Sequence, residues 1–143
     1  MPDPSRLVTI PTLDDLAMAP PGCSSMYVLE PAPNLHGQVD WRTEGPAIRD
    51  RLHAFLDEQG YPNDVLTEEL VTPLDWEAQG MAAGTPFALA HTFPQTGPFR
   101  PANVSKELPG LFFAGSNTVP GVGVPMVLIS GKLVAERVGR YLP

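Results

Sequence analysis

The chain has 143 residues and a formal net charge of −7, and 43% of its residues are hydrophobic against 17% that are charged. This balance is typical of one globular domain rather than a disordered chain, and the acidic charge argues against a nucleic-acid partner, because phosphate binding requires a basic surface. The single cysteine, Cys23, excludes an internal disulfide and a cysteine-based zinc cluster. The 18 prolines and 13 glycines predict that long helices and strands are few.

The sequence carries no pattern for export or for crossing a membrane. No basic segment followed by an apolar one occurs in the first residues, so no secretion signal is predicted. The longest apolar run, residues 119–129, is too short and too rich in glycine to span a bilayer. We therefore expect a cytoplasmic protein, and the sequence leaves peripheral contact with a membrane surface open.

Two strands and a helix are expected in the first part of the chain. Residues 6–12 are rich in β-branched side chains and end at a proline, which is typical of an edge strand. Residues 25–34 alternate between two faces before prolines interrupt them, which predicts a second strand. Residues 43–60 predict a helix with Pro46 in its first turn and Gly60 at its C-terminal end. The apolar face of this helix comprises Ile48, Leu52, Phe55 and Leu56.

In the second part of the chain, prolines and glycines interrupt the predicted helices and strands more often. Residues 65–80 predict a strand and then a short helix with Thr72 as its N-cap. Residues 81–110 contain many prolines and are expected to be mostly irregular. The apolar residues 111–114 predict a buried strand, and a helix should begin near Pro125. The apolar side of this last helix comprises Val127, Leu128, Gly131, Val134, Ala135 and Val138.

The common catalytic and metal-binding patterns fail on this sequence. The histidines His36, His53 and His91 are too far apart for a helical metal pair, so no metal is predicted. No serine lies in a G-x-S-x-G elbow, and the acidic residues suit solvated surfaces better than a catalytic carboxylate pair. The glycosylation sequon at 103–105 has no consequence without a secretion signal. We therefore predict no catalytic side chain.

A glycine-rich loop follows the predicted strand at 111–114 and opens the last predicted helix. It is not a pyrophosphate-binding turn, because Met126 stands where the third glycine of G-x-G-x-x-G should be. Glycines before a helix N-terminus let backbone amides approach a flat ligand, and the helix dipole stabilises negative charge there, which suits a reduced flavin. The alternative, that Gly121 and Gly123 only shape a tight turn, fits the spacing equally well.

Three segments carry a family resemblance: APPGCSSMYVLEPAPNL (19–35), PFRPANV (98–104) and GLFFAGSNTVPGVGVPMVLISGKLVAERV (110–138). They resemble the C-terminal end of the bacterial phytoene desaturases, FAD-dependent carotenoid dehydrogenases related to the amine-oxidase flavoproteins. The resemblance implies FAD as cofactor and a long isoprenoid, a carotenoid precursor, as substrate. It also implies flavin contacts by the backbone around Gly115, Ser116, Thr118, Gly121, Gly123, Val124 and Pro125.

The sequence departs from that family in two ways. The family's usual loop, G-A-G-T-H-P-G-A-G-I-P-G, differs from this chain at Ser116, Asn117, Val119 and Met126. These differences leave the class of enzyme in place and the exact substrate open. The N-terminal G-x-G-x-x-G unit, which holds the ADP half of FAD in the family, does not occur in the sequence.

We therefore expect an α+β fold that is part of a larger enzyme. Residues 1–104 would form a partial substrate-binding domain of mixed or antiparallel strands plus helices, and residues 105–143 the terminal strand, loop and helix of an FAD-binding α/β domain. The N-terminal FAD-binding region is an expected partner, so FAD is expected in the intact enzyme and not on this chain alone. One half of a split flavoenzyme and a non-enzymatic module for an apolar ligand are the alternatives. Apolar surface left open predicts self-association.

Overall fold

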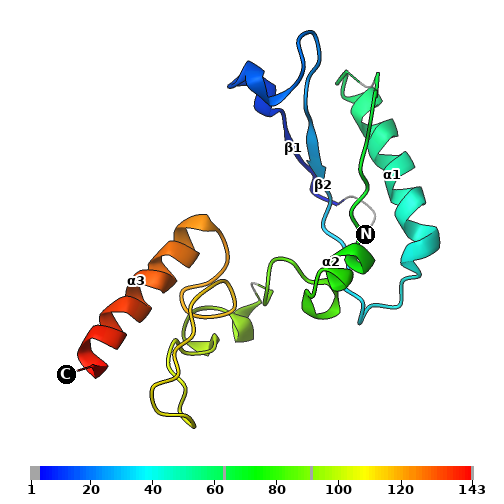
Figure 1. The fold of residues 1–143 in the computed structure, drawn as a ribbon. Helices are drawn as coiled ribbons and strands as arrows, with labels where there is room; N and C mark the ends of the chain where they lie inside the picture. Colours follow the sequence, from blue (N-terminus) through cyan, green and yellow to red (C-terminus); the bar gives the residue numbers. More distant parts are fainter. Residues whose placement is uncertain (1–3, 63, 91, 143) are drawn as a thin grey trace. The chain divides into compact units, whose positions relative to one another are not determined.

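The computed structural model describes residues 4–62, 64–90 and 92–142. The chain divides into two compact units, Met1–Gly84 and Thr85–Pro143. The described residues form three α-helices and one two-stranded antiparallel sheet (Figure 1), in agreement with the α+β prediction. The predicted division at residue 104 separates a substrate-binding part from an FAD-binding part, and it stays a prediction.

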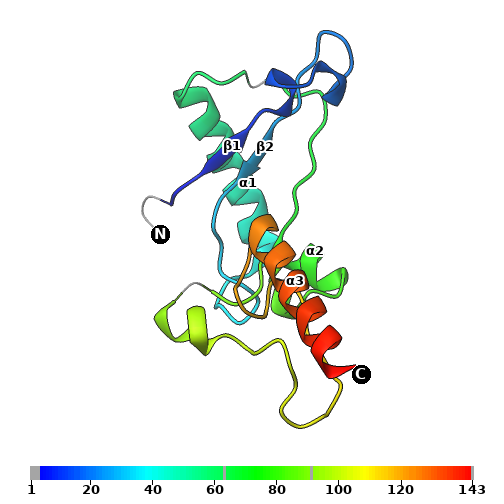
Figure 2. The same ribbon diagram turned by 90° about the vertical axis from the view of Figure 1, so that its left-hand side faces the viewer.

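The two predicted strands of the first unit form a small sheet. β1 (Leu7–Thr9) pairs antiparallel with β2 (Tyr27–Leu29) in a register that sets Val8 opposite Val28. Both strands are shorter than predicted, but both lie inside the predicted ranges. The two strands lie side by side next to helix α1 (Figure 2). The guanidinium of Arg6 lies 4.6 Å from the centre of the Phe55 ring, which fastens the sheet to this helix.

Helix α1 (Trp41–Glu58) begins earlier than predicted. The carboxylate of Asp40 accepts a hydrogen bond from the amide of Arg42 at 3.1 Å and caps the helix, so Pro46 lies in the second turn. The prediction that Pro46 occupies the first turn is therefore wrong. The predicted end is confirmed, because Gly60 adopts φ +75° and the amide of Tyr61 donates to the carbonyl of Leu56 at 2.9 Å.

The segment after α1 is extended but is not a strand. The strand predicted before residue 72 is absent from the described residues, and Leu66 is exposed there. Glu68 instead holds the segment to α1 by an ion pair with Arg49 at 3.6 Å and a hydrogen bond with His53 at 2.7 Å. These side-chain contacts replace the ladder of backbone hydrogen bonds that a neighbouring strand would supply. The predicted short helix α2 (Pro73–Ala78) follows, as expected.

The start of α2 depends on one carboxylate. Oδ2 of Asp75 accepts hydrogen bonds from the Thr72 backbone amide at 2.7 Å and from the Thr72 hydroxyl at 2.6 Å. The hydrogen bond from the Thr72 side chain, together with the one from the Thr72 backbone, lowers the pKa of Asp75 from its ordinary value. The charged form of Asp75 is thus the form that supports the helix start.

Asp75→Asn should therefore destabilise the first unit at neutral pH, and the difference from the unchanged chain should shrink in acid. Because the folded-state pKa is lowered, the stabilisation is present above the unfolded pKa and is lost as the pH falls through the folded pKa. We expect a difference below about 1 kcal/mol at neutral pH, since Asp75 is exposed to screening solvent. Urea unfolding followed by circular dichroism at neutral and acid pH measures it, and an equal difference at both would contradict the prediction.

The described residues between 85 and 110 are mostly irregular, as predicted. Residues 111–114 do not form the buried strand that the apolar run predicts: they make a single antiparallel bridge, Val104 to Phe112, and Leu111 and Phe113 are exposed. A buried strand needs partners on both sides, and only residues 103–105 pair with this segment in the described chain. Helix α3 (Val124–Tyr141) begins as predicted, with Pro125 in its first turn.

The inward side of α3 is less apolar than predicted. Val127, Val134 and Val138 are partly buried as expected, but Leu128 is 69% exposed, and Ser130 is the buried residue of the helix. A serine therefore occupies the closest approach of α3 to the rest of its unit.

Few apolar side chains are shielded from water in the described part of the chain. Only Trp41 and Leu56 among its hydrophobic residues are buried, whereas Val124 and Leu128 on α3 are 73% and 69% exposed. Such open apolar surface is what self-association would cover, and self-association stays a prediction. Among the described residues, none of the helices is long and apolar enough to cross a bilayer.

A flavin-type glycine loop

The loop between residues 113 and 124 has a backbone that requires glycine at several points. Gly115, Gly121 and Gly123 have φ values of +125°, +146° and +106°, in a region that side chains with a Cβ rarely adopt. A Cβ added to Gly115 or Gly123 would meet no other atom within 4 Å, whereas one added to Gly121 would lie 3.3 Å from Nε of Arg100. The loop thus turns one glycine inward and leaves two facing open space.

Arg100 holds the inward side of the loop. Its side chain is almost fully buried, and its Nη1 donates to the carbonyl of Ser116 at 2.7 Å while its Nη2 donates to the carbonyl of Leu89 at 3.0 Å. A guanidinium presents donors in a fixed planar fork, so it can bridge two carbonyls from different segments. Arg100 therefore ties the glycine loop to the irregular segment at the start of the unit.

A second buried group lies on the other side of the loop. Asn103 is 0% exposed, and its amide nitrogen lies 3.1 Å from the carbonyl oxygen of Phe113 and 3.0 Å from that of Val119. The hydroxyls of Thr118 and Ser130 each lie 3.1 Å from the same nitrogen. These contacts join the first half of the loop, residues 113–119, to helix α3.

The seven residues predicted to contact a flavin fall into three groups by exposure. Thr118 and Gly121 are buried, and the Thr118 hydroxyl donates to the carbonyl of Gly115, so its side chain supports the loop from within. Gly115 and Ser116 are partly exposed. The remaining residues, Gly123, Val124 and Pro125, are exposed at the start of α3.

The start of α3 presents unpaired amides to this open side. The amide of Val127 donates to the carbonyl of Gly123 at 2.9 Å and begins the helical pattern. The amides of Val124 and Met126 precede that pattern and have no helical acceptor, and Pro125 has no amide hydrogen. With the positive end of the helix dipole, these donors favour a ligand atom that carries partial negative charge.

Residues 25–139 match the sequence pattern of the flavin-containing amine oxidoreductase family. The chain belongs to this family. It is 54% identical over 144 residues to a phytoene dehydrogenase of Streptomyces griseus, with 96% of this chain and 28% of the relative covered. It is 44% identical over 140 residues to a zeta-carotene-forming phytoene desaturase of Myxococcus xanthus, with 94% and 27% covered. The chain thus spans little more than a quarter of the length of these relatives, and the resemblance stated from the sequence is confirmed.

The open side of the loop has room for a flat ring such as the family's flavin. A flat ring can approach the backbone at Gly115 and Gly123, because the positions where their Cβ atoms would stand are empty. The open amides at the start of α3 suit the electron-rich edge of such a ring. A site for the ADP half would need a G-x-G-x-x-G turn, which the 143 residues do not contain.

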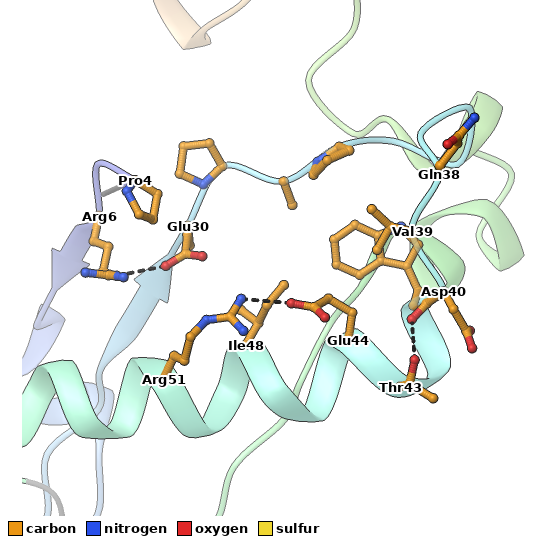
Figure 3. Close-up of a pocket in the computed structure, with 14 residues that line it drawn as sticks. Pro4, Arg6, Glu30, Gln38, Val39, Asp40, Thr43, Glu44, Ile48 and Arg51 are labelled. Carbon is orange, nitrogen blue, oxygen red and sulfur yellow. Dashed lines mark hydrogen bonds and ion pairs between the residues drawn. The ribbon is translucent and has the colours of Figure 1, made fainter. Parts of the chain in front are cut away.

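A groove in the first unit is lined by charged and apolar residues. It has a volume of about 600 Å³, and its lining includes charged side chains from both the sheet and α1. Figure 3 shows Arg6 paired with Glu30 and Arg51 paired with Glu44, at 2.8 and 3.0 Å. An open groove with charged walls is unsuited to enclosing a long hydrocarbon. In the part of the chain that the structure describes, no group of three histidine, cysteine or acidic residues could hold a metal.

Sequence analysis missed the residues that shape the loop: Arg100, Asn103, Ser130 and Arg137. The sequence assigned Asn103 to a sequon and to a segment that resembles the family, but to no structural role. The sequence of the last helix does contain a signal for this cluster. Ser130 and Arg137 are seven positions apart and interrupt its apolar face, so two polar side chains lie on its inward side. Buried polar residues need partners, so this interruption pointed to a polar cluster under the loop.

Proposed function

We propose that this chain supplies the loop-and-helix part of the flavin site in an FAD-dependent desaturase that acts on a long isoprenoid. The observation that carries the proposal is the loop that leads into α3: Gly115 and Gly123 have open space where a Cβ would stand, and the helix begins directly after Gly123 with amides that have no helical acceptor. The family membership supports FAD as the cofactor, and the relatives named as phytoene dehydrogenase and phytoene desaturase support a carotenoid precursor as the substrate.

The proposed contacts differ among the predicted residues. Gly123 and Val124 would face the flavin ring through their backbone, because both are exposed where α3 begins. Thr118 and Gly121 would hold the loop in shape without touching the ring, because both are buried. A bound flavin supplies the hydride acceptor that desaturation of an allylic carbon requires. The role of this chain is to orient the ring and to favour negative charge at its edge.

The alternative proposal is a non-enzymatic module that binds an apolar ligand. It would require a closed apolar tunnel within the chain. The described residues form the charged groove of the first unit and a shallow hollow of about 270 Å³ lined by Val104, Phe112, Arg137, Arg140 and Tyr141. Neither encloses a hydrocarbon, so the flavin proposal has the better support.

Co-production with a flavin-binding partner tests the proposed function. The partner is the N-terminal portion of the Streptomyces griseus phytoene dehydrogenase, up to the region that this chain matches. We expect a co-purified complex that is yellow, with about one flavin per complex, and that desaturates phytoene in membranes or detergent. The absorbance spectrum and pigment extraction measure the two results. A complex that forms in good yield but holds no flavin would contradict the proposal.

A further inference from the structure

We propose that Asn103 is the positioning residue that sets the glycine loop on helix α3, and that this placement governs flavin binding. The second part rests on the proposed function, whereas the first stands on the cluster itself. Asn103 is fully buried, and its backbone also takes part, since its carbonyl accepts from the amide of Phe113 at 2.9 Å. A buried amide at such a junction is held there by its hydrogen bonds rather than by apolar packing.

Arg137 fixes the orientation of the Asn103 amide. Its Nη1 lies 3.0 Å from Oδ1 of Asn103, and a guanidinium has donors only, so the amide oxygen must face it. The amide nitrogen then faces the carbonyls of Phe113 and Val119 at 3.1 and 3.0 Å. In the reverse orientation the NH₂ group of Asn103 would face the N–H donors of Arg137, and its oxygen would face two carbonyl oxygens, so neither contact could be a hydrogen bond. The position therefore requires an amide and rejects a carboxylate.

The two hydroxyls complete the cluster in a single consistent arrangement. Thr118 donates its only hydrogen to the carbonyl of Gly115 at 3.0 Å, so at its 2.9 Å contact with Ser130 it must accept. Ser130 in turn accepts from the amide of Gly115 at 3.1 Å. The amide nitrogen of Asn103 lies within hydrogen-bond distance of both carbonyls and both hydroxyls, so its two hydrogens serve a group of four acceptors. Asn103, Thr118 and Ser130 thus all have hydrogen-bond partners within the cluster.

The cluster determines where the loop lies relative to the start of α3. Its hydrogen bonds hold the loop at Gly115 and at Val119, and they hold α3 at Ser130, well inside the helix. The loop residues between these anchors therefore cannot shift without breaking a buried hydrogen bond. Gly123 lies four residues after the Val119 anchor and directly before α3, which the same cluster holds at Ser130.

Hydrogen exchange on the full 143-residue chain tests the first part. Asn103→Asp keeps the shape of the side chain but removes both amide hydrogens. We expect amide exchange at residues 113–119 to become faster by roughly tenfold or more, because two buried carbonyls lose their donors. Helix α1 should be unchanged. Asn117→Asp is the matched control, because it makes the same substitution at an exposed position of the same loop, and it should match the unchanged chain. Equal exchange in Asn103→Asp and Asn117→Asp would overturn the proposal.

A pair of Thr118 variants decides the question if Asn103→Asp unfolds the second unit. Thr118→Val removes the hydroxyl and keeps the shape, so it should speed exchange at 113–119 while the rest of α3 stays protected. Thr118→Ser keeps the hydroxyl and should restore the behaviour of the unchanged chain. A general loss of packing would affect both variants alike. Indistinguishable exchange in the two would overturn the positioning role.

Flavin affinity in the co-purified complex tests the second part. We expect Asn103→Asp to weaken flavin binding by at least about tenfold while the two portions still co-purify. Unaltered affinity despite a loosened loop would overturn this part. An unchanged complex that binds no flavin would instead contradict the proposed function, and the exchange results on the chain alone would still decide the role of Asn103.

Discussion

The 143-residue chain purified by itself should be colourless and should not desaturate phytoene, with or without added FAD. Its described flavin-type features are one glycine loop and the start of one helix. A helix dipole contributes about 0.3 to 1 kcal/mol to anion binding, and up to about 2 kcal/mol when partly buried. FAD that survives purification needs micromolar affinity or better, which is about 8 kcal/mol.

The missing binding free energy for FAD has a structural cause. Most of the affinity for FAD should come from the pyrophosphate and ribose, and the 143 residues contain no G-x-G-x-x-G turn to bind them. Absorbance between the near ultraviolet and the blue, together with fluorescence after denaturation, measures bound flavin. The matched control is the complex with the N-terminal portion of the relative. A yellow chain with near-stoichiometric flavin and no partner would overturn the expected division of the site.

The elements that the sequence predicts well are those with local causes. The end of α1 depends on Gly60, and the start of α2 depends on the contact between Thr72 and Asp75. Each of these causes lies within one turn of the helix boundary that it sets. The predicted start of α1 lies too late along the chain, because Pro46 suits a first turn but the helix is capped by Asp40. Proline restricts a helix start without fixing it, so the capping carboxylate decided the boundary.

The features that sequence analysis missed depend on contacts distant along the chain. The apolar run at 111–114 predicted a buried strand, but burial of a strand depends on neighbours that a local pattern cannot supply. Asn103 and Arg137 meet across the whole of the glycine loop, at 3.0 Å. Only the polar interruptions of the last helix hinted at this cluster. The family resemblance located the loop, and the hydrogen bonds beneath it show which of its residues face inward.

The inward and outward glycines of the loop should respond differently to the same substitution. In the co-purified complex, Gly121→Val should unfold the second unit. Its φ of +146° disfavours any side chain by about 1–3 kcal/mol, and a Cβ there would stand 3.3 Å from Nε of Arg100. Displacing Arg100 would leave the carbonyls of Ser116 and Leu89 without their donor, at roughly 1–3 kcal/mol each. A large fall in melting temperature is the expected result.

Gly123→Val should instead remove the flavin while leaving the second unit largely folded. Its φ of +106° carries a similar backbone cost, but a Cβ there would meet no atom within 4 Å, so Arg100 and the Asn103 cluster keep their contacts. The added side chain would occupy the space through which we expect the ring to approach the start of α3. Flavin absorbance and thermal melting, measured on the same sample, separate the two effects. If Gly123→Val retains flavin whenever it retains its fold, then the glycine serves only the turn, and the open side of the loop is not the flavin site.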